Sequence, residues 1–253
     1  MNFEKEQLLK HSLHTKYLGN HNSMISNDEA ISIYIHWPFC ISLCPYCDFN
    51  SHLLRKINIS EYISSYLKEI EIYYPLIKDK YIKSIFFGGG TPSLMDPKII
   101  SAIIDKISFI SRVDKSTEVT LEANPTSYEM ERFKDFKSSG VNRISIGVQS
   151  FNDDNLKFLG RKHSVKEAVK VIESTRNIFE NYSFDLIYGL YNQTESSLKH
   201  ELDLALSLAK NHLSLYQLTI EKGTEFYKLF QKQQLKVIDN DKSPSTLPQP
   251  SLT

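Results

Sequence analysis

The sequence predicts an α/β protein whose parallel sheet curls into a partial, open (β/α)6 barrel. Six short runs of β-branched and aromatic residues alternate with longer amphipathic stretches, a pattern typical of strand–helix units that build a parallel sheet. Each run is followed by a glycine-rich or polar segment, and the working residues of such barrels gather at the carboxyl ends of the strands. With 253 residues and 41% apolar side chains, the chain can bury one large core.

The strands and helices are expected in strict alternation along the chain. Strands are expected at 32–37, 82–87, 119–122, 143–148, 183–187 and 213–218. Helices are expected at 60–74, 97–111, 128–139, 165–179 and 195–210. In the last helix, apolar residues recur at helical spacing from Leu198 to Ala209 and form a stripe that can pack on a sheet. Gly140 and Asn211 follow two of these helices, where a left-handed C-terminal cap is expected.

The three cysteines of the chain directly follow the first expected strand. Cys40, Cys44 and Cys47 have the spacing C-x3-C-x2-C, which leaves too little chain for an ordinary disulfide. Three thiolates on a cubane of four irons leave one iron open to a reactive cofactor. A zinc site is the alternative, and it would need a fourth ligand such as His36 or His52.

Further segments accompany the cysteine motif: FFGGGTPSL at 86–94, LEANPTS at 121–127, GVNRISIGVQSF at 140–151, LGRKHS at 159–164 and FDLIYGL at 184–190. Together they resemble the radical S-adenosylmethionine (SAM) enzymes of the anaerobic coproporphyrinogen III oxidase group, over residues 31–227. The resemblance implies a TIM-like radical SAM barrel. It also implies a [4Fe-4S] cluster on Cys40, Cys44 and Cys47 that cleaves SAM to a deoxyadenosyl radical.

Phe49 distinguishes two branches of that group. The true oxidases carry a further cysteine two residues after the third, where this chain has Phe49. The order CPYCDFNS resembles instead the radical SAM heme chaperones (HemW-type), which bind heme and pass it to client hemoproteins. This branch implies heme and a client protein as partners, and a homodimer that depends on the cluster. The alternative is an oxygen-independent oxidase of porphyrin biosynthesis, whose partner is coproporphyrinogen III.

The resemblance also implies cofactor-binding residues at the strand ends, and it singles out no catalytic side chain. The loop residues Gly89, Gly90 and Thr91 would contact the amino group of SAM. Its ribose, amino and carboxylate groups would be held by Glu122, Gln149, Arg161 and Asp185. Three aromatic residues, Tyr34, Tyr46 and Phe49, would lie against SAM and the cluster.

Residue chemistry agrees with these roles but leaves plainer alternatives open. Arg161 suits a carboxylate because its planar guanidinium can donate two parallel hydrogen bonds, yet it could also cap the preceding helix. The glycines let the backbone approach a ligand closely, or they form a simple turn. Glu122 could be a surface residue, and an aromatic side chain beside a cluster can act as hydrophobic shielding.

Heme binding has weaker support in the sequence. The heme chaperones carry a C-terminal motif of the form His-Asn-x-x-Tyr-Trp, and no such run occurs here, where Trp37 is the only tryptophan. His52, His163 and His212 are candidate axial ligands on general grounds.

One further departure follows the fifth strand. Tyr191 and Asn192 replace the proline and glycine that are usual in the family after FDLIYGL. We therefore expect a different path for this loop and a lower affinity for SAM, although Asp185 is retained.

Composition limits the partners and the compartment. Lys plus Arg and Asp plus Glu number 30 each, so no overall field attracts nucleic acid or an anionic membrane. No stretch approaches the roughly 20 apolar residues of a transmembrane helix. The N-terminus lacks the pattern of a secretory signal, and clustered, odd-numbered thiols favour a reducing cytoplasm.

Three regions are expected along the chain. Residues 1–30 form a polar extension, 31–230 the radical SAM core, and 231–253 a proline-containing tail that is disordered or truncated. Proteins of the group continue with a further domain after the barrel. A truncated or frame-shifted product, inactive as a fragment, is therefore the remaining alternative.

Overall fold

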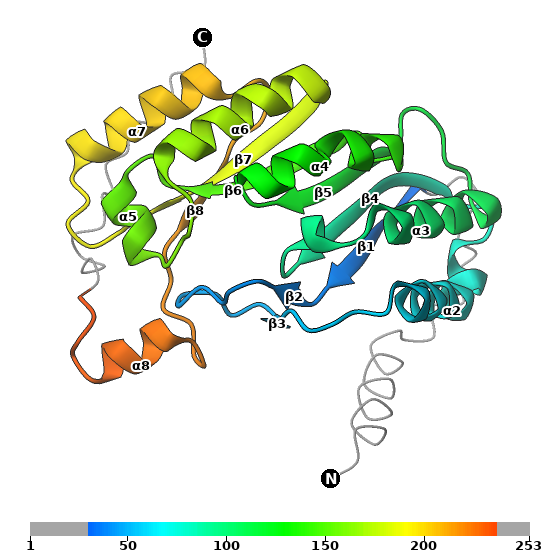
Figure 1. Ribbon diagram of the computed structural model, residues 1–253, viewed down its shortest axis with the longest axis horizontal. Coiled ribbons are helices and arrows are strands. Elements are labelled where there is room, and N and C mark those ends of the chain that lie inside the picture. The colour runs from blue at the N-terminus through cyan, green and yellow to red at the C-terminus, as the bar shows by residue number, and fades with distance from the viewer. Residues whose placement is uncertain (1–29, 237–253) are drawn as a thin grey trace.

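The computed structural model describes residues 30–236, in which six parallel strands form one sheet of order β1-β4-β5-β6-β7-β8 (Figure 1). The strands are β1 (Ala30–Trp37), β4 (Tyr81–Gly89), β5 (Glu118–Ala123), β6 (Arg143–Gln149), β7 (Asn181–Tyr188) and β8 (Ser214–Gln217). Sequential strands are neighbours, and the sheet curls into a half-barrel. The predicted partial (β/α)6 barrel is confirmed.

Helices connect the strands and cover the outer face of the sheet (Figure 1). They are α2 (Ile59–Ile77), η1 (Pro92–Leu94), α3 (Pro97–Ile110), α4 (Ser127–Ser138), α5 (Asp153–Phe158), α6 (Val165–Ile178), α7 (Glu195–Leu208) and α8 (Glu225–Gln231). Most begin at a side-chain cap; Ser164, for example, forms a capping box with Glu167 at the start of α6. Each parallel pair needs such a crossover.

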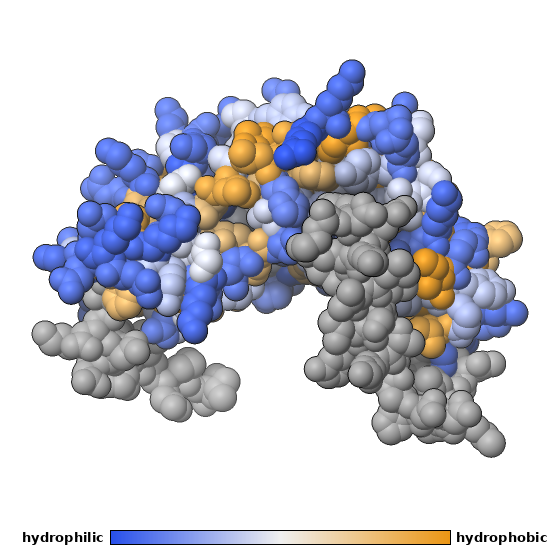
Figure 2. Space-filling view, turned by 90° about the horizontal axis from the view of Figure 1, so that it is seen from below, coloured by the Kyte–Doolittle hydropathy of each residue, from blue (hydrophilic) through white to orange (hydrophobic). Residues whose placement is uncertain are grey.

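The core lies between the sheet and these helices. Side chains alternate along a strand, so Leu121, Ile146 and Phe184 point to the helices and are fully buried. The alternate positions, such as Thr120 and Ser183, are polar and face the concave side of the half-barrel. Seen from below, the surface is mostly hydrophilic, with hydrophobic residues gathered in patches (Figure 2). The concave side is therefore built for polar contacts.

The predicted strands and main helices are all present, but several details differ. A two-stranded pair, β2 (Phe39–Cys40) with β3 (His52–Leu53), and the helix α8 were not predicted. Gly140 has φ +101° after α4, as expected for a left-handed cap. The same expectation for Asn211 is wrong, because α7 ends at Leu208 and Ala209 is already extended.

The extension at 1–30 and the tail at 231–253 lie almost entirely outside the described residues, so the predicted division of the chain remains a prediction. Within the described part, no helix combines the length and apolar character needed to cross a bilayer.

Candidate functional site

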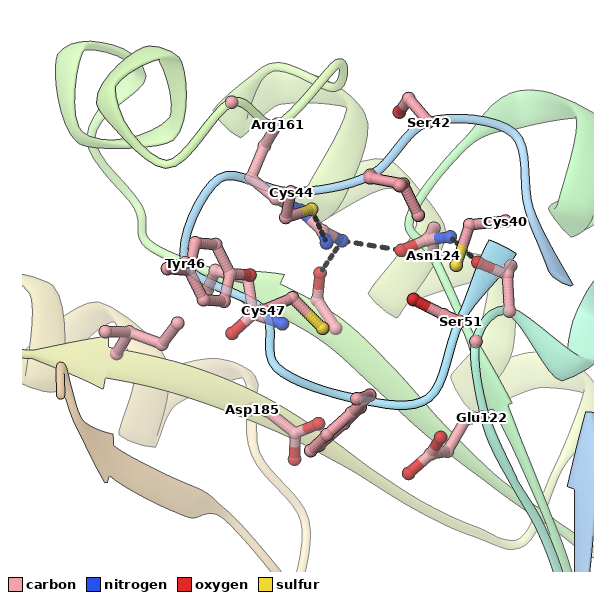
Figure 3. A pocket seen from close by; sticks show the side chains of 18 of the residues that line it. Cys40, Ser42, Cys44, Tyr46, Cys47, Ser51, Glu122, Asn124, Arg161 and Asp185 are labelled. Atoms are coloured by element: carbon pink, nitrogen blue, oxygen red, sulfur yellow. Dashed lines mark hydrogen bonds between the residues drawn. The ribbon is translucent and has the colours of Figure 1, made fainter. Parts of the chain in front are cut away.

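A cavity of about 440 Å³ opens at the carboxyl edge of the sheet. The end of every strand contributes to it, either directly or through the loop that follows. Its lining includes Cys40, Cys44, Cys47, Gly89, Gly90, Thr91, Glu122, Gln149, Arg161, Asp185 and Tyr216. Figure 3 shows several of these side chains pointing toward one another from different elements. The structure thus brings together nearly all the residues that the sequence singled out.

The cysteines lie on one loop that is closed at its base by β2 and β3. His52 donates its backbone N–H to the Pro38 carbonyl over 2.7 Å, and Leu54 donates its backbone N–H to the Cys40 carbonyl over 2.8 Å. All three thiols are free and partly exposed to the cavity. Burial raises the pKa of Cys47, and the neighbouring Cys44 and Cys40 raise it further. Burial and the nearby cysteines therefore oppose ionisation of Cys47, and a bound cation would favour its thiolate.

The donor set fits an iron–sulfur cluster. Soft thiolate ligands suit such clusters, and thiolates on different irons need not converge on one point. Among residues 30–236, no three Cys, His, Asp or Glu side chains are arranged to hold a single metal ion. For the zinc alternative, His36 is poorly placed, because its ring nitrogens lie 3.0 Å from the Asn50 carbonyl and 3.2 Å from the Tyr34 hydroxyl.

Arg161 connects the cysteine loop to the strand ends. Its guanidinium donates to Cys44 Sγ over 3.5 Å, to Asn124 Oδ1 over 2.6 Å and to the Gly147 carbonyl over 2.8 Å. Its backbone N–H caps α5 by donating to Leu156, but the side chain turns away into the cavity. The cap alternative therefore describes the backbone and not the guanidinium.

Two carboxyl groups lie across the cavity from the cysteine loop (Figure 3). Burial raises the pKa of Glu122 to about 7, against a hydrogen bond of 3.2 Å from the Gly89 N–H, and Asp185 raises it further. Burial also raises the pKa of Asp185. A hydrogen bond with the Ser214 side chain and the positive charge of Arg143 oppose this increase. Glu122 is therefore not a surface residue, and at neutral pH it is close to half ionised.

The glycine loop after β4 is sealed against β1 and β2. Gly90 and Thr91 donate their N–H groups to the carbonyls of Trp37 (2.7 Å) and Phe39 (2.8 Å). A Cβ on Gly90 would lie 2.7 Å from the Phe39 carbonyl oxygen, and Gly89 has φ +115°. Only glycine allows this approach. The loop is more than a simple turn, because it fixes the cysteine loop and the cavity edge together.

Gln149 reaches the cavity through a local distortion of β6. The ladder between β6 and β7 has an irregularity between Ile146 and Gln149, and Gln149 has φ +72°, a rare value for a residue other than glycine. Such conformations cluster at functional sites. The strain turns Gln149 toward the same space as Arg161, where a Cβ on Gly147 would lie 2.9 Å from Gln149 Nε2.

The aromatic candidates are less tightly grouped. Tyr46 lines the cavity and packs on Phe226, and burial raises its pKa. Phe49 also lines the cavity but is 60% exposed at its mouth. Tyr34 does not line the cavity. It lies on the concave face, stacked on Phe86 with ring centroids 6.1 Å apart, because residue 34 precedes the end of β1 by three positions.

The three candidate heme ligands differ in availability. His163 is buried, its Nε2 lies 3.0 Å from the Val148 carbonyl oxygen, and burial lowers its pKa to about 4. His212 Nδ1 lies 2.9 Å from Arg143 Nη2. The His52 side chain is exposed on β3 beside the cysteine loop. Of the three, His52 is the most accessible.

Two polar residues near the cavity, Asn124 and Glu129, were not predicted. Asn124 lies within the segment LEANPTS, two positions after Glu122 and directly after the end of β5, and this spacing was the available signal. Glu129 lies in the first turn of α4 and reads as an ordinary N-terminal acidic residue.

The open half-barrel with three free thiols at its mouth has a candidate cluster site at its strand ends. The sequence profile of the Radical SAM superfamily matches residues 34–205, and the chain belongs to this superfamily. Membership implies a [4Fe-4S] cluster and SAM as cofactors.

Within the superfamily the chain is HemW-like in sequence. It is 43% identical over 198 residues to the heme chaperone HemW of Buchnera aphidicola (Schizaphis graminum), covering 78% of this chain and 53% of that protein. It is 39% identical over 227 residues to the mitochondrial radical S-adenosyl methionine domain-containing protein 1 of Danio rerio, covering 89% and 51%. The chain therefore spans about half the length of the curated relatives it matches.

A solved structure supports the fold. Coproporphyrinogen III oxidase (HemN) from Escherichia coli, described as a radical SAM enzyme, superposes with a TM-score of 0.73 at 24% identity. The match covers 86% of this chain and 50% of that one. At this identity the likeness concerns the half-barrel alone.

Proposed function

We propose that this chain carries the cluster- and SAM-binding barrel of a HemW-type heme chaperone. The observation that carries the proposal is the cavity itself, in which three free thiols share one wall with Arg161 and face Glu122 and Asp185. Identity of about 40% to curated HemW proteins supports the same function. Cys40, Cys44 and Cys47 would hold the cluster, which when bound supplies an electron and an open iron for SAM.

The remaining cavity residues suit the parts of SAM. Arg161 carries a fixed positive charge, and the N–H groups that it does not donate to Asn124 and Gly147 can bind a carboxylate. Since the N–H groups of Gly90 and Thr91 are already donated, the glycine loop offers carbonyl oxygen to the ammonium group. The carboxyls of Glu122 and Asp185 can accept hydrogen bonds from ribose hydroxyls, with Gln149 beside them.

Heme would meet an apolar rim at the cysteine loop. Ile41, Leu43 and Phe49 are large exposed apolar residues there, and each lines the mouth of the cavity. An apolar macrocycle gains free energy by covering such surface. His52 lies on the adjoining strand and is exposed, so it can serve as an axial ligand.

Heme titration and an oxidase assay on the same preparation distinguish chaperone from oxidase. The reconstituted chain is mixed anaerobically with heme, and separately with coproporphyrinogen III, SAM and a reductant. We expect stoichiometric heme binding that weakens in His52→Ala but not in the control His200→Ala, which changes an exposed histidine on α7. Formation of protoporphyrinogen IX would instead establish the oxidase, and absence of heme binding would reject the chaperone role.

A further inference from the structure

The acid Glu129 is buried beside the cavity and is surrounded by donors. It accepts hydrogen bonds from the Ser93 hydroxyl and from Asn124, whose backbone N–H lies 2.5 Å and whose Nδ2 lies 3.4 Å from its carboxyl oxygens. Ser93 belongs to η1, which follows the glycine residues of β4, and Asn124 belongs to the loop after β5. Glu129 therefore joins two of the loops that form the cavity.

These contacts fix the orientation of the Asn124 amide. Its NH2 group faces acceptors, because Glu129 lies on that side and Thr91 Oγ1 is 3.3 Å away. Its oxygen must then point the other way, and there it accepts from Arg161 Nη2 over 2.6 Å. A flipped amide would place its NH2 group against a guanidinium that can only donate.

One nitrogen of the Arg161 guanidinium, Nη2, makes two hydrogen bonds. Nη2 donates to Asn124 Oδ1 and to the Gly147 carbonyl, while Nη1 faces the cysteine loop at Cys44. Removing the Asn124 oxygen would leave one anchor for this nitrogen. A long side chain with one anchor can rotate out of line with its ligand.

We propose that Asn124 and Glu129 are positioning residues that aim the Arg161 guanidinium at the carboxylate of SAM. This inference rests on the proposed function, in which Arg161 binds that carboxylate. Glu129 orients Asn124, Asn124 orients Arg161, and neither needs to touch the ligand. Asn124 also donates to Thr91 Oγ1, so the network links Thr91 to Arg161. In the proposed function Thr91 lies at the amino group of SAM and Arg161 at its carboxylate, and the network holds these two residues together.

The test compares SAM with its decarboxylated analogue, S-adenosyl-3-(methylthio)propylamine, by equilibrium binding to the reconstituted full chain. Asn124→Ala should weaken SAM about tenfold or more, as expected for a hydrogen bond to a charged group, and leave the analogue within about twofold. Glu129→Gln, which keeps the side-chain shape, should show the same selectivity with a smaller loss. Asn142→Ala is the control, because the Asn142 amide also both donates and accepts hydrogen bonds, with Thr117 and Val119, but Asn142 does not line the cavity.

Each outcome decides the proposal. A loss confined to SAM supports it. An equal loss for both ligands in Asn124→Ala and Glu129→Gln would assign these residues to folding alone, as would unchanged binding of SAM. If Asn124→Ala does not fold, by circular dichroism and urea unfolding, Glu129→Gln decides alone. Wild-type protein that holds a cluster but binds neither ligand would reject the proposed function itself.

Discussion

At the scale of single residues, the position of Glu122 in the cavity makes ionisation of its carboxyl group unfavourable. Its carboxyl group is buried, and its pKa rises from 4.5 to about 7. The folded state therefore holds this proton more tightly than the unfolded state does. The contribution of Glu122 to stability is favourable while the group is protonated, and it is lost as the pH rises from about 4.5 through about 7.

Replacement of Glu122 by glutamine should remove this dependence. In the ligand-free protein, Glu122→Gln should be more stable than wild type above pH 7 by about 3 kcal/mol, and the difference should vanish toward pH 4.5. Urea unfolding across this pH range measures it. The exposed Glu131→Gln is the control. An identical pH profile for both variants would show that Glu122 is not buried as described.

Motif residues and network residues differ in how far sequence could predict them. The cysteines, Glu122 and Arg161 are recognisable because their chemistry and spacing stand out at strand ends. Asn124 and Glu129 carry no such signal, because their importance comes from which atoms the fold brings within hydrogen-bond distance. A buried acid at a helix N-terminus looks in sequence like an exposed one.

At the scale of elements, Gly88 and Gly90 at the end of β4 differ in what surrounds them: side chains at Gly88 and backbone at Gly90. A Cβ on Gly90 would meet backbone atoms of Phe39 at 2.7–2.9 Å, and backbone cannot move cheaply. A Cβ on Gly88 would meet the rings of Tyr34 and Phe86, which are side chains and can shift more easily than backbone, and Tyr34 is 57% exposed.

Gly90→Ala should therefore destabilise the chain by about 1 to 3 kcal/mol, the usual cost of overpacking, and Gly88→Ala by less. Chemical unfolding of both variants measures the difference. Gly90→Ala should also weaken SAM binding. The added Cβ would push the segment at Gly90 away from Phe39, which directly precedes the cysteine loop. Equal destabilisation by the two substitutions would contradict the tight seal at Gly90.

The six strands were predictable because each is a short apolar run with a polar end, repeated at regular intervals. The pair β2–β3 was not, since each strand has two residues and exists only because the cysteine loop closes on itself. The same holds for α8, whose seven residues are too few to show a helical period and are stabilised by packing. In the loop at Tyr191 and Asn192, Asn192 adopts φ +67°, which asparagine tolerates better than most residues; the different path expected for this loop stays a prediction.

At the scale of the whole molecule, α8 ties the end of the described chain to the cysteine loop. Phe226 is 3% exposed and packs on Phe158 and Tyr46, with ring centroids 5.0 and 6.3 Å away. Its backbone N–H donates to the Pro45 carbonyl over 2.8 Å. Residues far apart in sequence thus hold the loop that presents the thiols.

Phe226→Ala should loosen this loop. The substitution should cost about 3 kcal/mol or more, as for other buried phenylalanines, and should speed the alkylation of the three thiols in the cluster-free chain. Phe230→Ala on the same helix is the control, because that side chain is 45% exposed. Mass spectrometry of alkylated peptides measures both variants, and equal rates would show that α8 does not restrain the cysteine loop.

The curl of the sheet and the convergence of its strand ends followed from the repeated pattern, because parallel strands with crossover helices carry their carboxyl ends to one edge. The polar concave face was less predictable. Arg143, for instance, is buried there among Thr120, Ser183 and His212, and nothing in the run RISIGV marks that arrangement.

The central claim is that this cavity holds an open-iron cluster with SAM beside it. Anaerobic reconstitution with iron and sulfide, then iron counting and EPR of the reduced protein with and without SAM, tests it most directly. We expect about four irons per chain and a spectrum that SAM perturbs. Bound zinc, or a chain that retains no iron, would contradict the claim.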